Sequence, residues 1–523
     1  MADDDTHTFQ NPIITGFNPD PTICVVPAAG STPTTCPIYS STDLVNWRLI
    51  GHALTRRSQI EMRTVEPGAG SWASSLRYRD REKRWYLGTG VFQRYRPSSD
   101  ERIFPQGFYV YTDNIWSDDA WSGPIYFENP RFDQSLCWDA NDKVYLSTTM
   151  RLANRRPDSK LKDFAIHISE IDLETGRTLT PPSVIRESHS GLAEGSHILR
   201  RGEYYYLFTA EGGTKTGHQE WVFRSREGVY GPWEAQGRPL WYNGPDEEVQ
   251  RTGHADVFED GEGNWWAVLL GVRLIKSNDG RYLEPQLGQE TFLVKVDWVN
   301  DWPVFNEGRN ITLTTVGRST VKQNLSCHAK GEVKWQADLR NADLELGWYQ
   351  KSRGFCVYFG NYYPLDSPEA PAMLLRKQTS YTESFQCEMT FRPRKVRYEG
   401  GVVLWWSQYS YASCGVKLLD HSDGRLGPTL VLRLPSGRLN ALTEPMTTGL
   451  SVFLCIDATP TEYTISFQTG PFSQAYRIAV QDLTIAPPVG STFAGVMFGV
   501  YEFGNGEPVL DPADFTNILI KQN

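Results

Sequence analysis

Short apolar runs recur along the N-terminal part of the chain, each after a polar turn. They are rich in aromatic and branched side chains, the composition of β-strands. Four of them are Trp85–Leu87, Val144–Leu146, Tyr205–Leu207 and Trp266–Val268. Their central residues lie 59, 61 and 61 positions apart. A repeat of about 60 residues containing only short strands predicts a β-propeller with five large blades, spanning roughly residues 15–305.

The same repeat marks one position in each predicted blade. Twelve residues before three of the run centres stand Ser74, Asp133 and Glu194, and thirteen before the fourth stands His254. A further 54 residues back from Ser74 stands Asp20, between two prolines that stiffen its backbone. Because the first strand of a blade lines the central channel, we expect these equivalent positions to converge on one axis.

Three carboxylates and a histidine in one phase indicate a reactive site. Like charges brought together raise one another's pKa, so such a group is costly as structure alone. The alternative is that each carboxylate is a solvated turn residue.

A different pattern begins after Trp302. A polar stretch follows, and beyond it apolar and polar residues alternate over Phe385–Phe391, Gly401–Trp406 and Pro428–Leu434. Such alternation, with turn residues between the runs, is typical of an antiparallel sandwich. The expected fold is therefore all-β. We predict a five-bladed propeller at residues 1–307, a linker at 308–325 and a β-sandwich domain at 326–523.

Length and composition narrow the possible partners. A chain of 523 residues exceeds what one core usually serves, so two domains are expected. The net charge of −10 argues against nucleic acid as a partner, and no run of about 18 apolar residues indicates a membrane span. The first ten residues lack the basic and apolar regions of a secretory signal. We expect an intracellular protein as encoded, with secretion through a missing leader as the alternative.

Eight cysteines are scattered along the chain without a CxxC pair. This spacing does not favour zinc binding. We expect free thiols, most of them buried.

Several segments carry a family resemblance. They are Asn11–Thr22, Ser41–Trp47, Phe132–Leu136, Glu194–Gly195 and Thr209–Thr214. With them the chain resembles glycoside hydrolase family 43, whose β-xylosidases and α-L-arabinofuranosidases have a five-bladed propeller followed by a concanavalin-like jelly roll. The resemblance implies that Asp20 is the general base and Glu194 the general acid. It implies that Asp133 sets the pKa and orientation of that acid.

The resemblance also indicates residues that contact the sugar. These are Trp72 as a platform, Thr214, His254 and Gln289, although Trp72 could instead pack between blades and His254 could be a satisfied core histidine. In the second domain, Phe503 beside a glycine-rich turn is predicted to close the pocket against water. An ordinary strand aromatic is the alternative for Phe503.

Other positions depart from the family pattern. The segment between Cys24 and Tyr39 is too rich in Pro, Gly and Thr for the expected aromatic second strand. Either another loop rebuilds the pocket wall there or the first blade is incomplete. Gln289 replaces an arginine and lacks its charge and fork of donors. Arg151 stands where related xylosidases often carry an aromatic residue.

The resulting hypothesis is an inverting exo-glycosidase. It would remove terminal β-D-xylosyl, or α-L-arabinofuranosyl, residues from xylo- or arabino-oligosaccharides derived from hemicellulose. This chemistry requires no cofactor, and a structural calcium near His254 is the metal considered. The alternative is a carbohydrate-binding propeller that has lost catalysis, which the altered first blade, Arg151 and Gln289 favour. The pattern carries no information on oligomeric state.

Overall fold

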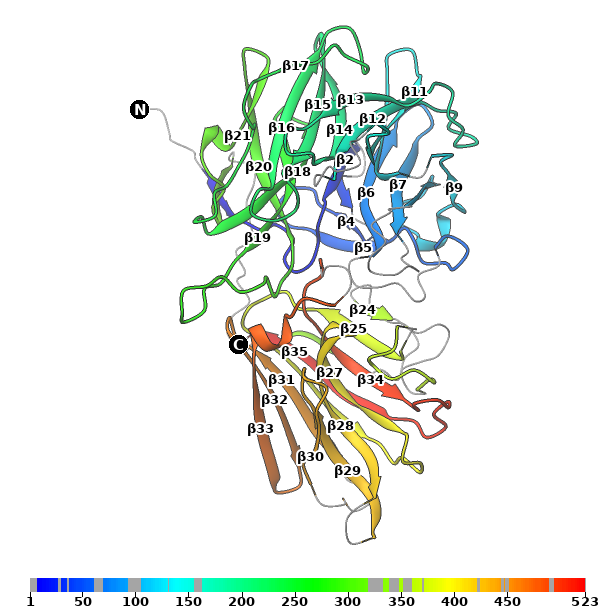
Figure 1. The fold of residues 1–523 in the computed structure, drawn as a ribbon, viewed down its shortest axis with the longest axis vertical. Helices are drawn as coiled ribbons and strands as arrows, with labels where there is room; N and C mark the ends of the chain where they lie inside the picture. Colours follow the sequence, from blue (N-terminus) through cyan, green and yellow to red (C-terminus); the bar gives the residue numbers. More distant parts are fainter. Residues whose placement is uncertain are drawn as a thin grey trace. The chain divides into compact units, whose positions relative to one another are not determined.

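The computed structural model describes most of the chain (Figure 1). The described residues are 7–26, 30–34, 37–60, 69–92, 105–129, 131–154, 162–317, 333–337, 348–350, 360–368, 371–420, 424–443, 446, 451–488 and 493–522. They divide into two compact units. The first contains Met1–Met62, Ala69–Arg273 and Gln289–Asn324, and the second contains Arg63–Gly68, Leu274–Gly288 and Leu325–Asn523.

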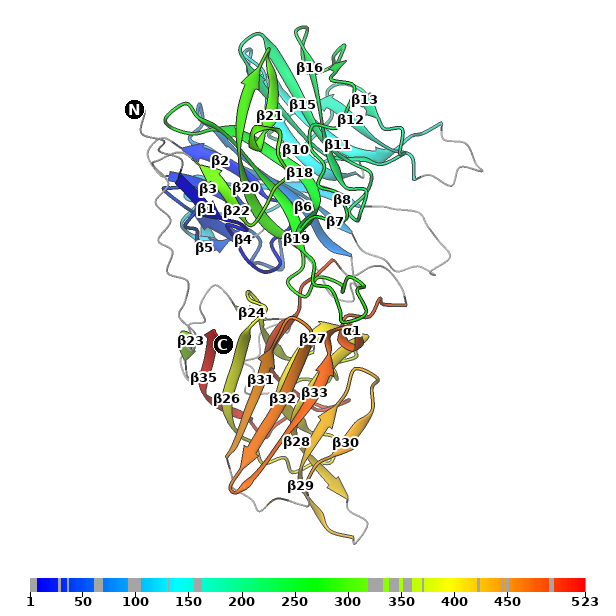
Figure 2. The same cartoon turned by 90° about the vertical axis from the view of Figure 1, so that its left-hand side faces the viewer.

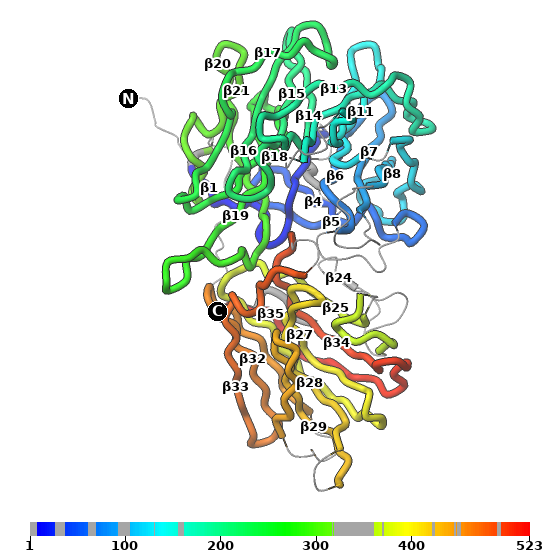
Figure 3. Tube along the Cα trace, in the orientation of Figure 1, coloured from blue at the N-terminus to red at the C-terminus, as the bar shows by residue number. Residues whose placement is uncertain are grey.

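Five four-stranded antiparallel sheets form the first unit, and each is built from strands that follow one another in the chain (Figures 1 and 3). These sheets are the blades of the predicted propeller. Blade one contains β2 (Thr22–Val26), β3 (Gly30–Thr34), β4 (Pro37–Ser40) and β5 (Arg48–His52). Blade two contains β6 (Gly70–Arg79), β7 (Arg84–Phe92), β8 (Gln106–Thr112) and β9 (Ile125–Tyr126). Blade three contains β10 (Phe132–Trp138), β11 (Val144–Arg151), β12 (Phe164–Glu170) and β13 (Ser183–Glu187). Blade four contains β14 (Ala193–Arg201), β15 (Tyr204–Glu211), β16 (Gln219–Ser225) and β17 (Glu234–Ala235). Blade five contains β18 (Val249–Glu259), β19 (Trp265–Arg273), β20 (Glu290–Val299) and β21 (Trp302–Phe305).

The first strands of the blades contact one another in sequence. β2 contacts β6, β6 contacts β10, β10 contacts β14, and β14 contacts β18. β18 in turn contacts β2. A separate hydrophobic cluster lies between each pair of neighbouring blades. Tyr86 and Tyr109 of blade two, for example, pack against Leu136 and Leu146 of blade three. Second strands such as β7 are buried on both faces, which explains why their sequences read as continuous apolar runs.

Blade one corrects a prediction. Of the two alternatives for this segment, an incomplete blade does not hold, because β3 pairs with β2 from Thr22 opposite Thr34 to Val26 opposite Gly30. Backbone pairing with a neighbour outweighs the weak strand preference of Gly, Ser and Pro here. The blade therefore has four strands like the others, and β3 contains no aromatic residue.

A further pair of strands joins the two ends of the propeller. β1 (His7–Gln10) runs antiparallel to β22 (Thr314–Gly317), so part of the predicted linker belongs to a sheet. The buried side chain of Asn11 bonds the backbone oxygen of Leu293 and the hydroxyl of Thr315. Two 3₁₀ turns, η1 (Asp118–Ala120) and η2 (Asn306–Gly308), complete the described elements of this unit.

The second unit is a sandwich of two antiparallel sheets (Figure 2). One sheet has the order β23 (Val333–Ala337), β35 (Asp514–Gln522), β26 (Glu383–Thr390), β31 (Val452–Ala458), β32 (Glu462–Thr469) and β33 (Phe472–Ala479). The other has the order β24 (Trp348–Gln350), β25 (Met373–Lys377), β34 (Met497–Phe503), β27 (Glu399–Ser407), β28 (Ser410–Asp420), β29 (Leu426–Arg433) and β30 (Leu439–Ala441). A short helix, α1 (Val480–Leu483), follows β33.

The core of the sandwich lies between its two sheets. Phe385 and Met389 of β26 pack in one cluster with Leu404 and Trp406 of β27 and Val416 of β28. The burial of β26 alternates along most of its length, whereas β27 is buried at every position, because Val403 and Trp405 on its other face join a second buried cluster with Met373 and Tyr411.

One segment predicted within the propeller groups with the sandwich unit. Leu274–Gly288 connects β19 to β20, and its Leu283 joins the sandwich core cluster. The side-chain oxygen of Gln286 accepts a hydrogen bond from the hydroxyl of Tyr463 at 2.9 Å. The second unit is thus discontinuous in sequence.

Candidate active site

The first strands of blades two to five share one irregularity. Their pairing with the second strands breaks after Trp72, Phe132, Glu194 and Gly253, and resumes three residues later. Such a β-bulge bends the strand and re-aims a side chain. The positions marked by the sequence repeat therefore lie at a β-bulge that recurs in blades two to five.

The pairing of first and second strands moves two of the predicted equivalent positions by one residue. The residues that directly follow the breaks are Ala73, Asp133, Gly195 and His254. Glu194 therefore precedes the shared position by one residue, and Ser74 follows it by one. The hairpin between first and second strand differs in length from blade to blade: Tyr206 pairs with Leu199, seven residues earlier, whereas Tyr145 pairs with Cys137, eight residues earlier.

Several residues at this position adopt the left-handed backbone. The φ angle is 49° at Asp20, 51° at Asp133 and 53° at His254, and 56° at Gly195. For residues other than glycine, such conformations cost of the order of 1–3 kcal/mol and persist only where neighbouring groups hold them. The contacts of these residues are therefore informative.

Asp20 and His254 form an ion pair between blades one and five. Nδ1 of His254 lies 2.8 Å from Oδ1 of Asp20. Burial alone would lower the pKa of His254, but the charge and hydrogen bond of Asp20 outweigh it and raise that pKa to about 9. His254 is therefore a cation near neutral pH, and its charge lies against the carboxyl group of Asp20.

Asp133 connects blade three to the backbone beside Glu194. Its Oδ2 accepts a hydrogen bond from the backbone N–H of Gly195 at 3.0 Å and one from the hydroxyl of Thr149 at 3.3 Å. Gly195 directly follows Glu194. Asp133 thus fixes the strand that carries Glu194.

The carboxyl groups of Glu194 and Asp133 differ in pKa. Burial raises the pKa of Glu194 to about 7, with a further rise from the charge of Asp133. Burial raises the pKa of Asp133 to about 6, against the opposing charge of His254. Glu194 therefore keeps its proton to a higher pH than Asp133 does, and a carboxyl group that is protonated near neutral pH is what general acid catalysis needs.

A polar cluster lies two residues further along each inner strand. Arg77 of blade two bonds Asp256 at 2.7 Å, the hydroxyl of Thr22 at 2.9 Å and Nδ1 of His197 at 2.9 Å. Ser135 also lies 3.0 Å from the same His197 nitrogen. These residues come from all five blades and join them beneath the carboxylates. We call them the channel plug.

The predicted sugar-contacting residues of the propeller differ in their surroundings. Trp72 is half-buried and packs on Phe92, with ring centroids 4.7 Å apart, and edge-on against Phe132 at 5.5 Å. These contacts fit the packing alternative for Trp72. Thr214 is exposed in the turn after β15. Gln289 is half-buried, and its backbone oxygen accepts a hydrogen bond from Asn18 N at 2.8 Å, two residues before Asp20.

Phe503 occupies a different setting from the one predicted. It ends β34, is 3% exposed and stacks on Tyr501, with centroids 5.8 Å apart. It belongs to a cluster of the second unit with Trp405 and Tyr411. The structure therefore gives its ring a packing role, and almost none of the ring is available to a substrate.

The described residues around His254 give no support to the calcium ion considered from the sequence. Among the described residues, no group of three or more potential histidine, cysteine or carboxylate ligands was found. Nδ1 of His254 already faces Asp20, and a protonated imidazole has no lone pair for a metal.

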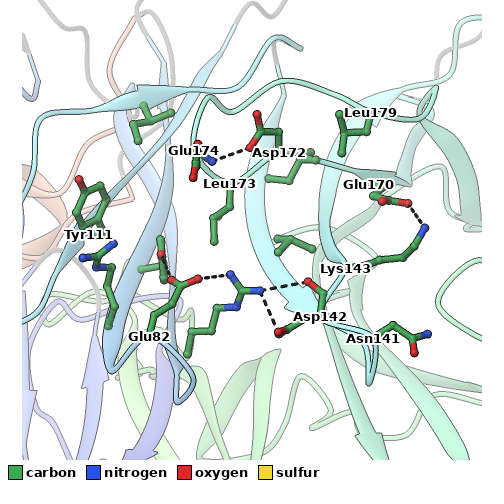
Figure 4. A pocket seen from close by; sticks show the side chains of 16 residues that line it. Glu82, Tyr111, Asn141, Asp142, Lys143, Glu170, Asp172, Leu173, Glu174 and Leu179 are labelled. Carbon is green, nitrogen blue, oxygen red and sulfur yellow. Dashed lines mark hydrogen bonds and ion pairs between the residues drawn. The ribbon is translucent and has the colours of Figure 1, made fainter.

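A separate cleft of about 680 Å³ lies between blades two and three (Figure 4). Its lining includes Glu82 and Asp142, which both pair with Arg79, and Lys143, which pairs with Glu170 at 2.9 Å. It contains none of the predicted site residues and lies at the end of β10 away from Asp133. Many of the charged side chains that line this cleft form ion pairs with one another.

Sequence reasoning missed several residues of the site. They are Arg77, His197 and Asp256. His197 and Asp256 share one repeat position, two residues after the bulge, so a search of that phase for polar residues would have found them. Arg77 carries no such signal, because it lies two residues beyond that position.

The structure describes five of the eight cysteines. Cys24, Cys137, Cys387, Cys414 and Cys455 are free thiols. Cys36, Cys327 and Cys356 lie outside the described residues.

Among the described residues, no helix has the length and apolar character needed to cross a bilayer.

Comparison with known proteins gives consistent matches. The sequence profile described as "Glycosyl hydrolases family 43" matches residues 9–303, and that described as "Beta xylosidase C-terminal Concanavalin A-like domain" matches residues 332–521. A non-reducing end α-L-arabinofuranosidase from Bacteroides ovatus is 30% identical, with 97% of this chain and 94% of that protein covered. A β-xylosidase from Bacillus subtilis is 33% identical, with 82% and 81% covered. Among solved structures, a xylan β-1,4-xylosidase from Bacillus halodurans has a TM-score of 0.83 at 23% identity, with 98% and 100% covered, which supports the fold.

Proposed function

Because the chain belongs to glycoside hydrolase family 43, we propose that it is an inverting exo-glycosidase that releases single pentose units from the non-reducing ends of xylo- or arabino-oligosaccharides. Relatives named as β-xylosidases and as an α-L-arabinofuranosidase support both pentoses as candidates. One observation carries the proposal. The pKa of Glu194 is raised to about 7, while Asp20 faces the imidazolium of His254.

In the proposed mechanism, Glu194 donates its proton to the glycosidic oxygen as the bond to the sugar breaks. Asp20 removes a proton from a water molecule that attacks the anomeric carbon from the opposite face. Inversion requires space for that water, with carboxyl groups about 6.5–9.5 Å apart. Asp133 supports the acid through its hydrogen bond to Gly195 and through its charge.

The alternative of a propeller without catalysis loses part of its support. It rested in part on an incomplete first blade, and that blade has four strands. Trp72, Thr214, His254 and Gln289 remain proposed neighbours of the sugar, with His254 acting through Asp20. The family chemistry needs no cofactor.

The direct test is hydrolysis of nitrophenyl β-D-xyloside and nitrophenyl α-L-arabinofuranoside by purified protein, with polymeric xylan as the control for exo-action. We expect release of nitrophenol from at least one pentoside and little sugar from xylan. Asp20→Asn should lower kcat by about 10² to 10⁴-fold. Binding of the pentosides without turnover by the wild-type protein would support the non-catalytic alternative instead.

A further inference from the structure

Glu220 is a buried carboxyl group with no place in the proposed mechanism. It lies in β16, the third strand of blade four, where it pairs with Ala210 of β15. Ala210 in turn pairs with Glu194 of β14. Paired residues of antiparallel strands point to the same face, so Glu220 lies on the same face of the blade as Glu194, two strands away.

The side chain of Glu220 reaches the bulge of blade five. Its Oε2 accepts a hydrogen bond from the backbone N–H of Ala255 at 3.0 Å, and the residue is 1% exposed. Ala255 is fully buried and directly follows His254. Without this carboxyl oxygen, the N–H of Ala255 would lose a hydrogen-bond acceptor, which is costly for a buried donor.

His254 has a strained backbone and a closely packed ring at this bulge. Its φ of 53° is held at a point where the strand ladder is interrupted. Its ring also fits closely against blade four, because a Cβ atom at Gly195 would lie 2.6 Å from Cδ2 and Nε2 of His254. A small rotation of the bulge would therefore either press the ring on Gly195 or lengthen the 2.8 Å contact with Asp20.

We propose that Glu220 is a positioning residue for the general base: it holds the bulge of blade five so that His254 faces and orients Asp20. This inference rests on the proposed function, in which Asp20 activates the water. Glu220 touches neither the base nor the acid directly, and acts through the backbone of Ala255.

The protonation state of Glu220 suggests the conservative substitution. Burial raises its pKa to about 8, so the group is neutral at pH 6. Glutamine is neutral, has nearly the same shape and keeps a carbonyl oxygen for the N–H of Ala255. Methionine has similar volume but no strong acceptor, so it removes the hydrogen bond without leaving a cavity.

The test compares Glu220→Gln and Glu220→Met with the wild type at pH 6, on a nitrophenyl pentoside and on the corresponding disaccharide. A misplaced base slows every substrate alike, whereas a misplaced acid mainly slows poor leaving groups. We expect Glu220→Met to lower kcat by about 10 to 100-fold on both substrates by the same factor, with little change in KM. Glu220→Gln should remain within about threefold of the wild type.

Glu502 of the second unit provides a matched control. It is also a fully buried carboxyl group, its Oε2 accepts the backbone N–H of Gly360 at 2.8 Å, and burial raises its pKa to about 9. Glu502→Met should lower the melting temperature to a similar degree without the shared loss of kcat. If Glu502→Met lost as much kcat as Glu220→Met, the effect would be one of general stability and the proposal would be wrong.

A second readout does not depend on turnover. A hydrogen-bonded imidazole proton between His254 and Asp20 should give a far-downfield proton NMR signal in the wild type and in Glu220→Gln, and the signal should shift or vanish in Glu220→Met. An unchanged signal in Glu220→Met, or a loss of kcat confined to the disaccharide, would overturn the proposal. Absence of any pentosidase activity in the wild type would instead contradict the proposed function, and the NMR comparison would still test the role of Glu220.

Discussion

At the scale of single residues, the proton on Glu194 decides the pH range of activity. Its raised pKa of about 7 comes from burial and from the charge of Asp133. The acid works only when protonated, so kcat/KM should fall as the pH rises through about 7. Asp133→Asn removes the neighbouring charge, which lowers the pKa of Glu194 and moves the alkaline limb of the pH profile to lower pH. A limb that stays in place or moves to higher pH would contradict this assignment.

Leaving groups separate the acid from the base. A nitrophenolate departs with little protonation, whereas the sugar of a disaccharide needs a proton. Glu194→Gln should therefore lose far more kcat/KM on xylobiose than on nitrophenyl xyloside, and Asp20→Asn should lose about 10² to 10⁴-fold on both. Glu82→Gln, in the separate cleft, is the control and should leave the ratio of the two rates unchanged. If Glu194→Gln lowered kcat/KM by the same factor on both substrates, Glu194 would not be the general acid.

These residues could be predicted to different degrees. Asp20, Asp133 and Glu194 were found because a motif and a repeat both mark them. Phe503 could not be placed, because a glycine-rich turn beside an aromatic residue fits a projecting loop and a strand end equally well. Glu220 gave no signal, since the backbone group it binds is chosen by the stacking of two blades.

At the scale of elements, the strands and hairpins of the blades explain both a success and an error of the sequence analysis. The repeat of about 60 residues was readable because second strands buried on both faces are continuously apolar. The phase differs by one at Glu194 because the hairpin from β14 to β15 is one residue shorter than that from β10 to β11, with Tyr206 opposite Leu199 and Tyr145 opposite Cys137. β3 was missed because pairing with β2 outweighs the composition of its sequence.

The bulge of blade four makes a specific prediction at Gly195. A Cβ atom there would press on the ring of His254 at 2.6 Å, and the φ of 56° also disfavours alanine. Gly202 has nearly the same φ of 58° but nothing within 4 Å of the added atom, so it is a matched control. Both alanine variants should be destabilised by about 1–2 kcal/mol, measured by denaturant unfolding. Only Gly195→Ala should also lose most of its kcat. Full activity in Gly195→Ala would show that His254 has more room than the structure indicates.

At the scale of the whole molecule, the channel plug is expected to stabilise the propeller. Arg77 pairs with the buried Asp256 and also bonds Thr22 and His197, so one side chain joins four blades. Arg77→Met leaves Asp256 buried without its partner, which should cost about 3–5 kcal/mol. The control is Arg281→Met, whose pair with Asp279 is exposed. Calorimetry should show a clear drop in melting temperature for Arg77→Met and little change for the control; similar melting temperatures for both would show that the plug is not a major source of stability.

The division into units was predictable only in outline. A polar linker and a change from a repeat to alternation indicate two domains. The segment Leu274–Gly288 nevertheless groups with the second unit, through Leu283 and Gln286. Its turn residues read as an ordinary hairpin loop of blade five, and local sequence carries no sign of the distant core that it joins.

The anomer of the first product tests the central claim most directly. If Asp20 activates a water on the face opposite the leaving group, hydrolysis inverts the anomeric carbon. Proton NMR during the first turnovers, before mutarotation, should show α-xylose released from a β-xyloside, or β-arabinose from an α-arabinofuranoside. Release of a sugar with the anomeric configuration of the substrate would contradict inversion, and with it the roles proposed for Asp20 and Glu194.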